Sequence, residues 1–357
     1  MKIDVIPARQ LTPEHVAAWA GMQEADPALE SPYFRPEFTQ AVASVRNDVE
    51  VAVLEEDGVP AGFFPFQRGR WQVGRAVGGP MSDFHGVIAR RDLAWNAAEL
   101  VRACGLTAWN FDHLLAEQTP FQRFHYTTAS SPFMDLSRGF ESYVVERQRA
   151  GSHRVRNSAR LVRKVEREVG PIRFESHSTD PSVFASLVEW KTAQYRKTGA
   201  TCVFSFPWTI ELLKRVLGCR GPGFAGQMAI LSIGDRLVAV DLGLRSHGVF
   251  HSWFPAYDRE LAQYSPGMIL LLEMARAAES QGIRRIDLGK GPDSYKVSWM
   301  SGATTLAVGS VAVVPVVSTL RRSWHRTRDW LRTSPLRIPV RAAGRLTRPL
   351  RGWLAFR

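Results

Sequence analysis

The sequence predicts an α/β protein of the α+β kind, in which helices flank mixed sheets, and three patterns indicate this fold class. Apolar and aromatic residues alternate over 249–254, a leucine-rich helical pattern follows, and residues 283–288 form a second short strand. Turn residues at Asp57-Gly58 and Gly234-Asp235 each separate two strand patterns, as in hairpins. The first half of the chain also runs strand, helix, strand. We therefore expect two similar α/β halves in tandem.

In the first half, the expected elements follow one another with short connections. A Pro at the first helical position, Pro13, marks the first helix. The expected elements are a strand at 2–8, a helix from Thr12, strands at 48–55, 60–67 and 71–79, a helix at 91–104 and a strand at 107–113.

The second half contains a βαβ unit, which makes its two strands parallel neighbours. Pro255 is expected to end the strand at 249–254, and Ser265-Pro266-Gly267 to open the next helix with Ser as its cap and Gly282 as its stop. The helix start then lies at the carboxyl end of the first strand, where its backbone N–H groups favour an anion such as a pyrophosphate. An ordinary capped helix is the alternative. The other expected elements are strands at 172–177, 226–233 and 236–245 and helices at 181–198 and 207–217.

Length and composition indicate a soluble globular protein with two cores. The chain has 357 residues, of which 45% are hydrophobic and 22% charged. Three cysteines without a CxxC spacing argue against a disulfide framework or a cysteine metal site and fit a reducing cytoplasm. The apolar run at 306–317 is too short to span a bilayer, and we see no signal peptide. We expect a cytoplasmic protein.

The positive charge is concentrated in two segments. Residues 321–357 hold eleven arginines and one aspartate, and so account for +10 of the net charge of +12. Tryptophans among these arginines favour a peripheral contact with an anionic membrane, with nucleic acid as the less favoured partner and a solvated tail as the alternative. A second cluster lies on a helix expected at 148–169, capped by Ser152. That helix either packs on the body through its apolar stripe or binds a phosphate-bearing surface.

The run from Tyr257 to Trp299 carries a family resemblance. Tyr257-Asp258, Ser265-Pro266-Gly267, the leucine-rich helix, and the later Gly282, Asp287, Gly289, Gly291 and Tyr295-Lys296 resemble acyltransferases of the GNAT fold in the CelD (cellulose biosynthesis)-like family, which are distantly similar to FemAB peptidyl transferases. The resemblance extends to about Val316. It implies four segments: a degenerate GNAT-like half at 1–140, a basic helical connection at 141–171, an acyl-CoA-binding GNAT domain at 172–316 and a basic tail at 317–357.

The resemblance also implies an activity. It implies transfer of an acyl group, with acetyl-CoA as the expected donor and no metal, to an amine or hydroxyl of an envelope or exopolysaccharide acceptor. Three alternatives remain open: a long-chain lipid N-acyltransferase at the membrane, a FemAB-like transferase that uses aminoacyl-tRNA, and a non-catalytic assembly factor. The residues expected to bind the cofactor are Phe254, Tyr257, Ser265, Pro266, Gly267, Met268 and Leu270.

The acid–base candidates lie on the same stretch. An acceptor ammonium must lose a proton, and the leaving sulfur can take one. We expect His251, Asp287, Tyr295 and Lys296 to carry this chemistry, with His251 as the first choice of base. Each has a structural alternative: His251 and Tyr295 can pack, and Asp287 can pair with Lys296. Asp241, inside an apolar strand, and Asp258 are further candidates.

Overall fold

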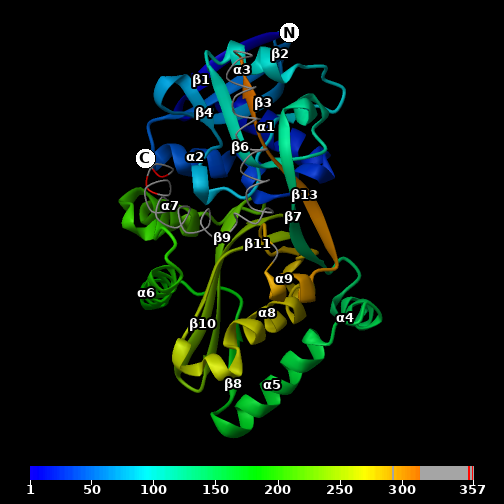
Figure 1. The fold of residues 1–357 in the computed structure, drawn as a ribbon, viewed down its shortest axis with the longest axis vertical. Helices are drawn as coiled ribbons and strands as arrows, with labels where there is room; N and C mark the ends of the chain where they lie inside the picture. Colours follow the sequence, from blue (N-terminus) through cyan, green and yellow to red (C-terminus); the bar gives the residue numbers. More distant parts are fainter. Residues whose placement is uncertain (292, 314–352, 354–355, 357) are drawn as a thin grey trace, which may run out of the picture. The chain divides into compact units, whose positions relative to one another are not determined.

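The chain folds into two compact units, each discontinuous in sequence (Figure 1). The computed structural model describes residues 1–291, 293–313, 353 and 356. Unit 1 comprises Met1–Ala129, Gly199–Leu212 and Thr305–Arg357, and unit 2 comprises Ser130–Thr198 and Leu213–Thr304. The four segments predicted from the sequence were continuous, and their functional assignment stays a prediction.

Unit 1 is a sheet with helices on both faces. Its strands follow the order β1-β2-β3-β4-β6-β13, and β5 pairs with β3. Its elements are β1 Lys2–Pro7, α1 Pro13–Ala25, α2 Pro36–Val45, β2 Val49–Glu56, β3 Val59–Arg68, β4 Val73–Arg75, β5 Ile88–Ala89, α3 Ala97–Ala103, β6 Ala108–Leu115 and the greater part of β13 Gly302–Ala312.

Phe63 and Phe64 are adjacent residues of β3 and pack on opposite faces of this sheet, because successive strand side chains point to opposite sides. Phe63 stacks on Trp19 of α1, with ring centroids 5.1 Å apart. Phe64 packs edge-to-face on Trp109 of β6, with centroids 4.9 Å apart, in the core that α3 covers. All four side chains are buried, so the sheet is the middle layer of unit 1.

The strands of unit 2 run both parallel and antiparallel to their neighbours. Its strands follow the order β7-β12-β11-β10-β9-β8. Its elements are the later part of β7 His125–Asp135, α4 Phe140–Arg149, α5 Arg154–Glu168, β8 Ile172–Glu175, α6 Pro181–Thr198, the later part of α7 Pro207–Gly218, β9 Ala225–Ile233, β10 Arg236–Ser246, β11 Val249–Tyr257, α8 Pro266–Arg276, β12 Arg285–Asp287 and α9 Ser294–Trp299.

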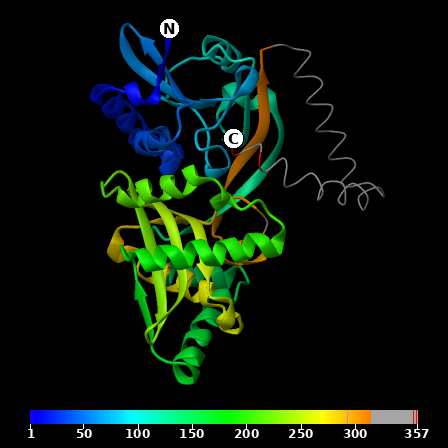
Figure 2. The same cartoon turned by 90° about the vertical axis from the view of Figure 1, so that its left-hand side faces the viewer.

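Helices cover the strands of unit 2 as the amphipathic patterns require. Helix α8 packs on β9, β10 and β11, and α5 lies against α8. Helix α6 packs on β10 and β11, and Figure 2 shows it in green across the strands. Strands β11 and β12 are parallel, which confirms the predicted βαβ unit.

Several predicted boundaries in the first half are wrong. The helix expected at 91–104 is the shorter α3, whose cap Asn96 accepts hydrogen bonds from the N–H groups of Ala98 and Glu99. The strand expected at 71–79 is reduced to β4, because Trp71 has a left-handed φ of 54°. Strand β7 was not expected, since its polar half gives little alternation.

In the second half, the structure corrects where some predicted helices and strands break or end. The basic helix expected at 148–169 is two helices, α4 and α5, because Gly151 turns the chain at φ 78°. Ser152 is not a cap; its hydroxyl donates to the carbonyl of Ser298 at 2.6 Å. Pro255 does not end β11, which continues to Tyr257 because the edge facing β10 keeps its pairing. Helix α8 ends at Arg276, six residues before Gly282.

Two sequence expectations concern membranes. Among the described residues, no helix is both long and apolar enough to cross a bilayer. The predicted basic tail at 317–357 lies outside the described residues, apart from Trp353 and Phe356. The membrane contact expected of that tail therefore stays a prediction.

Candidate active site

The parallel strands β11 and β12 pair over only three residues. Val249, Phe250 and His251 face Arg285, Ile286 and Asp287 in register. Strand β12 ends there, whereas β11 continues to Tyr257 with β10 on its other side. Past His251, β12 therefore offers no partner to the backbone of β11. A strand edge of this kind can pair with an extended ligand.

A β-bulge lies on the same part of β11. Leu242 of β10 pairs with Phe254, and the next residue, Gly243, pairs with Ser252. Trp253 is therefore the extra residue on β11. Bulges re-aim side chains and disrupt the ladder locally, and they occur often beside active sites.

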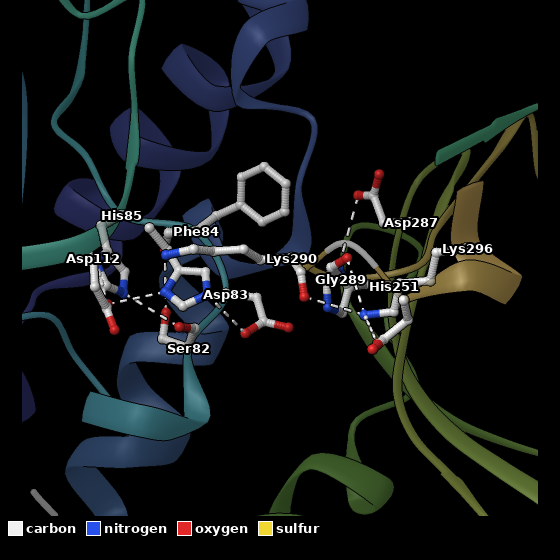
Figure 3. Close-up of polar contacts among 12 residues, drawn as sticks. Ser82, Asp83, Phe84, His85, Asp112, His251, Asp287, Gly289, Lys290 and Lys296 are labelled. Carbon is white, nitrogen blue, oxygen red and sulfur yellow. Dashed lines mark hydrogen bonds and ion pairs between the residues drawn. The ribbon is translucent and has the colours of Figure 1, made fainter. Parts of the chain in front are cut away.

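His251 and Asp287 lie side by side because they are partners in the β11–β12 register (Figure 3). The His251 Nδ1 lies 3.8 Å from Asp287 Oδ2, and both side chains are buried. Arg285 donates from Nε to Asp287 Oδ1 at 2.7 Å. Burial acts to raise the pKa of Asp287, but the Arg285 guanidinium and the neighbouring His251 together outweigh it and hold that pKa below its usual value. Asp287 is therefore a carboxylate at neutral pH.

Asp241 on β10 is the second buried carboxyl group, as the sequence suggested. Its side chain is 3% exposed, and Ser252 donates from its hydroxyl to Oδ2 at 2.6 Å. Its other oxygen, Oδ1, is buried without a hydrogen-bond partner among the described residues. Burial raises the pKa of Asp241 to about 6, although Ser252 and the ammonium group of Lys191 oppose the rise. A carboxyl group with this pKa can take up or release a proton near neutral pH.

Two further groups act electrostatically on Asp241. Burial lowers the pKa of Lys191, on α6, to about 8. Tyr295 on α9 is half-buried, and burial together with the negative charge of Asp241 raises the pKa of its phenol. Tyr295 therefore stays protonated and can donate a proton or a hydrogen bond.

Lys296 contacts backbone carbonyls of the loop that follows β12. Its ammonium group donates to the carbonyls of Gly289 and Lys290 at 3.2 and 3.1 Å (Figure 3). It also lies 3.4 Å from the Asp293 carboxylate rather than pairing with Asp287. Lys296 thus braces the loop after β12, in which Gly289 takes a φ of 74°.

Asp258 is a structural residue. Its carboxylate accepts from Arg236 Nε at 3.0 Å and from the backbone N–H of Glu260 at 2.9 Å. It thereby caps the 3₁₀ helix Arg259–Tyr264.

The residues predicted to bind the cofactor divide into exposed and buried positions. Phe254, Pro266 and Leu270 are buried, and Leu270 belongs to the unit 2 core, so these positions offer backbone rather than side chain. Tyr257 is 42% exposed, whereas Met268 packs partly against the core. The predicted cofactor-binding residues therefore offer a segment of backbone more than a set of side chains.

The start of α8 differs in one respect from the expected cap. Pro266 is the first helical residue, as predicted. Ser265 occupies the cap position but has a left-handed φ of 51° and makes no side-chain cap hydrogen bond, so the first N–H groups of α8 are not satisfied by its hydroxyl. A Cβ on Gly267 would contact only the Tyr257 ring, at 3.5 Å. The helix start is thus open at Gly267.

Three members of the site were missed by sequence reasoning: Ser252, Lys191 and Arg285. Arg285 lies two residues from Asp287, so the period of a strand could have indicated that they share a face. Lys191 reaches Asp241 only through the packing of α6 on β10, which no local pattern reports.

A family model agrees with this geometry. The model of the acetyltransferase (GNAT) domain matches residues 152–297, which include β11, α8 and β12. The chain carries a GNAT acyltransferase domain. Its enzyme class is therefore that of an acyltransferase, and the GNAT fold generally uses acyl-CoA. No curated protein matches the chain. The narrower CelD-like assignment is not what the family model matches.

Solved structures show the same fold over nearly the whole chain. FemX has a TM-score of 0.58 at 9% identity and covers 90% of this chain and 100% of its own. The C-terminal domain of a putative lysylphosphatidylglycerol synthetase from Agrobacterium fabrum has a TM-score of 0.55 at 12% identity, over 88% of this chain and 95% of its own. A tandem GNAT protein from the clavulanic acid biosynthesis pathway has a TM-score of 0.50 at 12% identity, over 88% and 99%. At these identities the likeness shows the fold, a mixed α/β fold that a tandem GNAT protein shares.

Proposed function

We propose that the GNAT domain transfers an acyl group, with acetyl-CoA as the donor, to an amine or hydroxyl, and that Asp241 is the general base. One observation carries the assignment of the base. Asp241 Oδ1 is buried and lacks a hydrogen-bond partner among the described residues, while burial raises the pKa of the carboxyl group to about 6. A buried acceptor without a donor is costly, and an incoming ammonium or hydroxyl group would satisfy it.

The donor would lie along β11. The edge of β11 beyond His251 has no strand partner in β12, so its backbone N–H and C=O groups can pair with the amide groups of an extended pantetheine arm. The pyrophosphate would then meet the start of α8, where Gly267 leaves the backbone accessible. Both features lie within residues 249–267 of the same unit.

The proton balance assigns a role to each group. The acceptor nitrogen or oxygen gives its proton to Asp241 and forms the bond to the acyl carbon, and the bond from that carbon to sulfur breaks. Tyr295, which stays protonated, donates to the leaving thiolate and later recovers its proton from solvent. Ser252 orients the Asp241 carboxylate through the 2.6 Å hydrogen bond. His251 is completely buried, and its Nδ1 lies 3.8 Å from Asp287 Oδ2.

The acceptor is assigned from the family resemblance and from the charge of α5. An envelope or exopolysaccharide acceptor at the cytoplasmic face, as the CelD-like resemblance implies, is our first choice. An exposed basic face on α5 fits an anionic acceptor, since these side chains point to solvent: Arg154, Arg156, Arg160, Arg163, Lys164 and Arg167. A long-chain acyl donor, an aminoacyl-tRNA donor and a non-catalytic role are the alternatives.

Turnover of Asp241→Asn tests the proposal. Release of CoA thiol would be followed with a panel of amino sugars, amino acids and aminoalkyl lipids as acceptors. We expect the variant to lose about 10²–10⁴-fold in turnover, the range for a lost general base. The wild-type rate should fall below pH 6, because Asp241 becomes protonated there. Asp235→Asn, in an exposed turn of the same unit, is the matched control. Equal turnover of Asp241→Asn and Asp235→Asn would refute the role of Asp241.

A further inference from the structure

We propose that unit 1 contains a binding site for a divalent transition metal, with Zn²⁺ as the fitting ion, formed by His85, Asp112 and His113. One ligand atom from each of these three side chains lies within 4.8 Å of the others. All three residues belong to unit 1, and no step of the proposed reaction uses them.

The backbone holds these residues in place independently of any ion. His85 bridges to β6: its N–H donates to the His113 carbonyl at 2.8 Å, and the Leu115 N–H donates to the His85 carbonyl at 3.1 Å. Because both hydrogen bonds are between backbone groups, the loop that carries His85 is fixed against the strand that carries the other two ligands.

A β-bulge explains how two consecutive residues of β6 contribute to one site. Neighbouring side chains on a regular strand point to opposite faces. Between β6 and β13, however, Ala307 pairs with Leu114 and Gly309 with Phe111, so β6 uses three residue steps where β13 uses two. The extra residue falls at Asp112-His113. A bulge of this kind re-aims a side chain and allows both residues to approach His85.

The tautomer of His85 leaves its ligand nitrogen available. Nε2 lies 3.3 Å from the Ser82 carbonyl, which can only accept, so Nε2 carries the proton. Nδ1 then holds the lone pair; it is buried and has no hydrogen-bond partner among the described residues. An imidazole fixed by a backbone carbonyl through its other nitrogen is the usual arrangement at a metal site.

Asp112, which is labelled in Figure 3, and His113 complete the set of ligands. Asp112 Oδ1 lies 3.8 Å from His85 Nδ1 and 2.9 Å from His113 Nδ1. Asp83 Oδ1 lies 3.6 Å from His113 Nε2 and can orient that ring from the other side. Two imidazoles and one carboxylate form the donor set of catalytic zinc sites, which keep a further position for water. Bonds of about 2.0–2.2 Å require the three ligand atoms to draw closer by a small side-chain movement.

Polar contacts of His113 with Asp112 and Asp83 alone are the competing interpretation, because such a cluster also satisfies these groups. It predicts no affinity for a metal. Metal binding by the full chain, prepared without a histidine tag, distinguishes the two interpretations.

The experiment measures Zn²⁺ affinity by competition with a chelator, and ligand geometry from the visible absorption of bound Co²⁺. We expect one Zn²⁺ per wild-type chain and an affinity at least about 100-fold weaker in His85→Gln and in His113→Gln. Gln can retain the hydrogen bond to Ser82 but provides no imidazole. His153→Gln, at an exposed position, should bind as the wild type does.

Two results would overturn the metal site: absence of stoichiometric Zn²⁺ binding, or equal affinity in the wild type and His85→Gln. If His85→Gln fails to fold, Asp112→Asn decides, because the Asp112 side chain is 61% exposed and its loss does not disturb a core. Asp112→Asn with wild-type Zn²⁺ affinity and an unchanged Co²⁺ spectrum would also overturn the proposal.

Discussion

The two units each contain a buried histidine whose Nδ1 lies 3.8 Å from an aspartate oxygen, yet the surroundings give the two pairs different chemistry. In unit 2, Asp287 is 1% exposed and is held by Arg285, and a second buried carboxyl group, Asp241, lies on the neighbouring strand β10. In unit 1, Asp112 is 61% exposed, and the further group is an imidazole, His113.

The distance between histidine and aspartate alone therefore does not assign a function to either pair. Where the carboxylates are buried, their pKa values move apart: that of Asp241 rises to about 6 and that of Asp287 falls. Two carboxyl groups with separated pKa values are suited to hold and transfer a proton. Where two imidazoles meet an exposed carboxylate, the same distance is better suited to a metal ion.

Among the variants that test this difference between the two units, Asp241→Asn is expected to change the free energy of unfolding most. The folded pKa of about 6 exceeds the ordinary value of 3.8, so the folded state binds this proton more tightly than the unfolded state does. The stability that this proton confers on the folded state is fully present below pH 3.8 and is lost as the pH rises to about 6. Above that pH, the buried and ionised Asp241 carboxylate costs the folded state about 3 kcal/mol. We expect Asp241→Asn to be more stable than the wild type at pH 8 by up to about this amount.

Urea titrations at pH 4 and pH 8 measure the effect, with Asp235→Asn as the control that should show no such gain. A loss of turnover together with a gain of stability would mark Asp241 as a functional residue. Asp241→Asn that is less stable than the wild type at pH 8 would show that the carboxylate is stabilising, contrary to the assigned cost of its burial.

A smaller effect is expected from Asp287→Asn, in the opposite direction. Loss of the charge-assisted hydrogen bond to Arg285 should cost about 1.5–3 kcal/mol at pH 7. Because the folded pKa of Asp287 is below its ordinary value, the stabilisation is present above that ordinary value and disappears as the pH falls through the folded pKa. The exposed counterpart Asp112→Asn should change stability by no more than about 0.5 kcal/mol in metal-free buffer. Equal costs for the two variants would remove the distinction between the pairs.

Much of unit 2 could be predicted from the sequence, because its signals are local. The βαβ unit follows from strand alternation, the Pro266-Gly267 helix start and a leucine-rich face, and the parallel pairing is confirmed. The helix α6 was predicted with the bounds that it has, Pro181–Thr198. The strands and hairpins in the second half of the chain were predicted to within a few residues.

The remainder depends on tertiary packing. The break between α4 and α5 requires Gly151 to turn at a positive φ, which a continuous run of helix-forming residues conceals. The bulges at Trp253 and at Asp112-His113 arise from register between strands. The exposed Asp112 and buried His85 are distant in sequence, and only the pairing of the His85 loop with β6 brings them together.

Calorimetric titration of acetyl-CoA into Gly267→Asp tests whether acyl-CoA binds to unit 2 at β11 and the start of α8. An aspartate in the first turn stabilises a helix, and a Cβ there would make only an ordinary contact, so the variant should fold. Its carboxylate would repel a pyrophosphate at that helix start, and a few kcal/mol of repulsion near a protein surface corresponds to a loss of affinity of at least about tenfold. Gly21→Asp, which adds the same charge at an exposed position in unit 1 with open space around it, should bind as the wild type does. Equal acetyl-CoA affinity in all three proteins would contradict the assigned site.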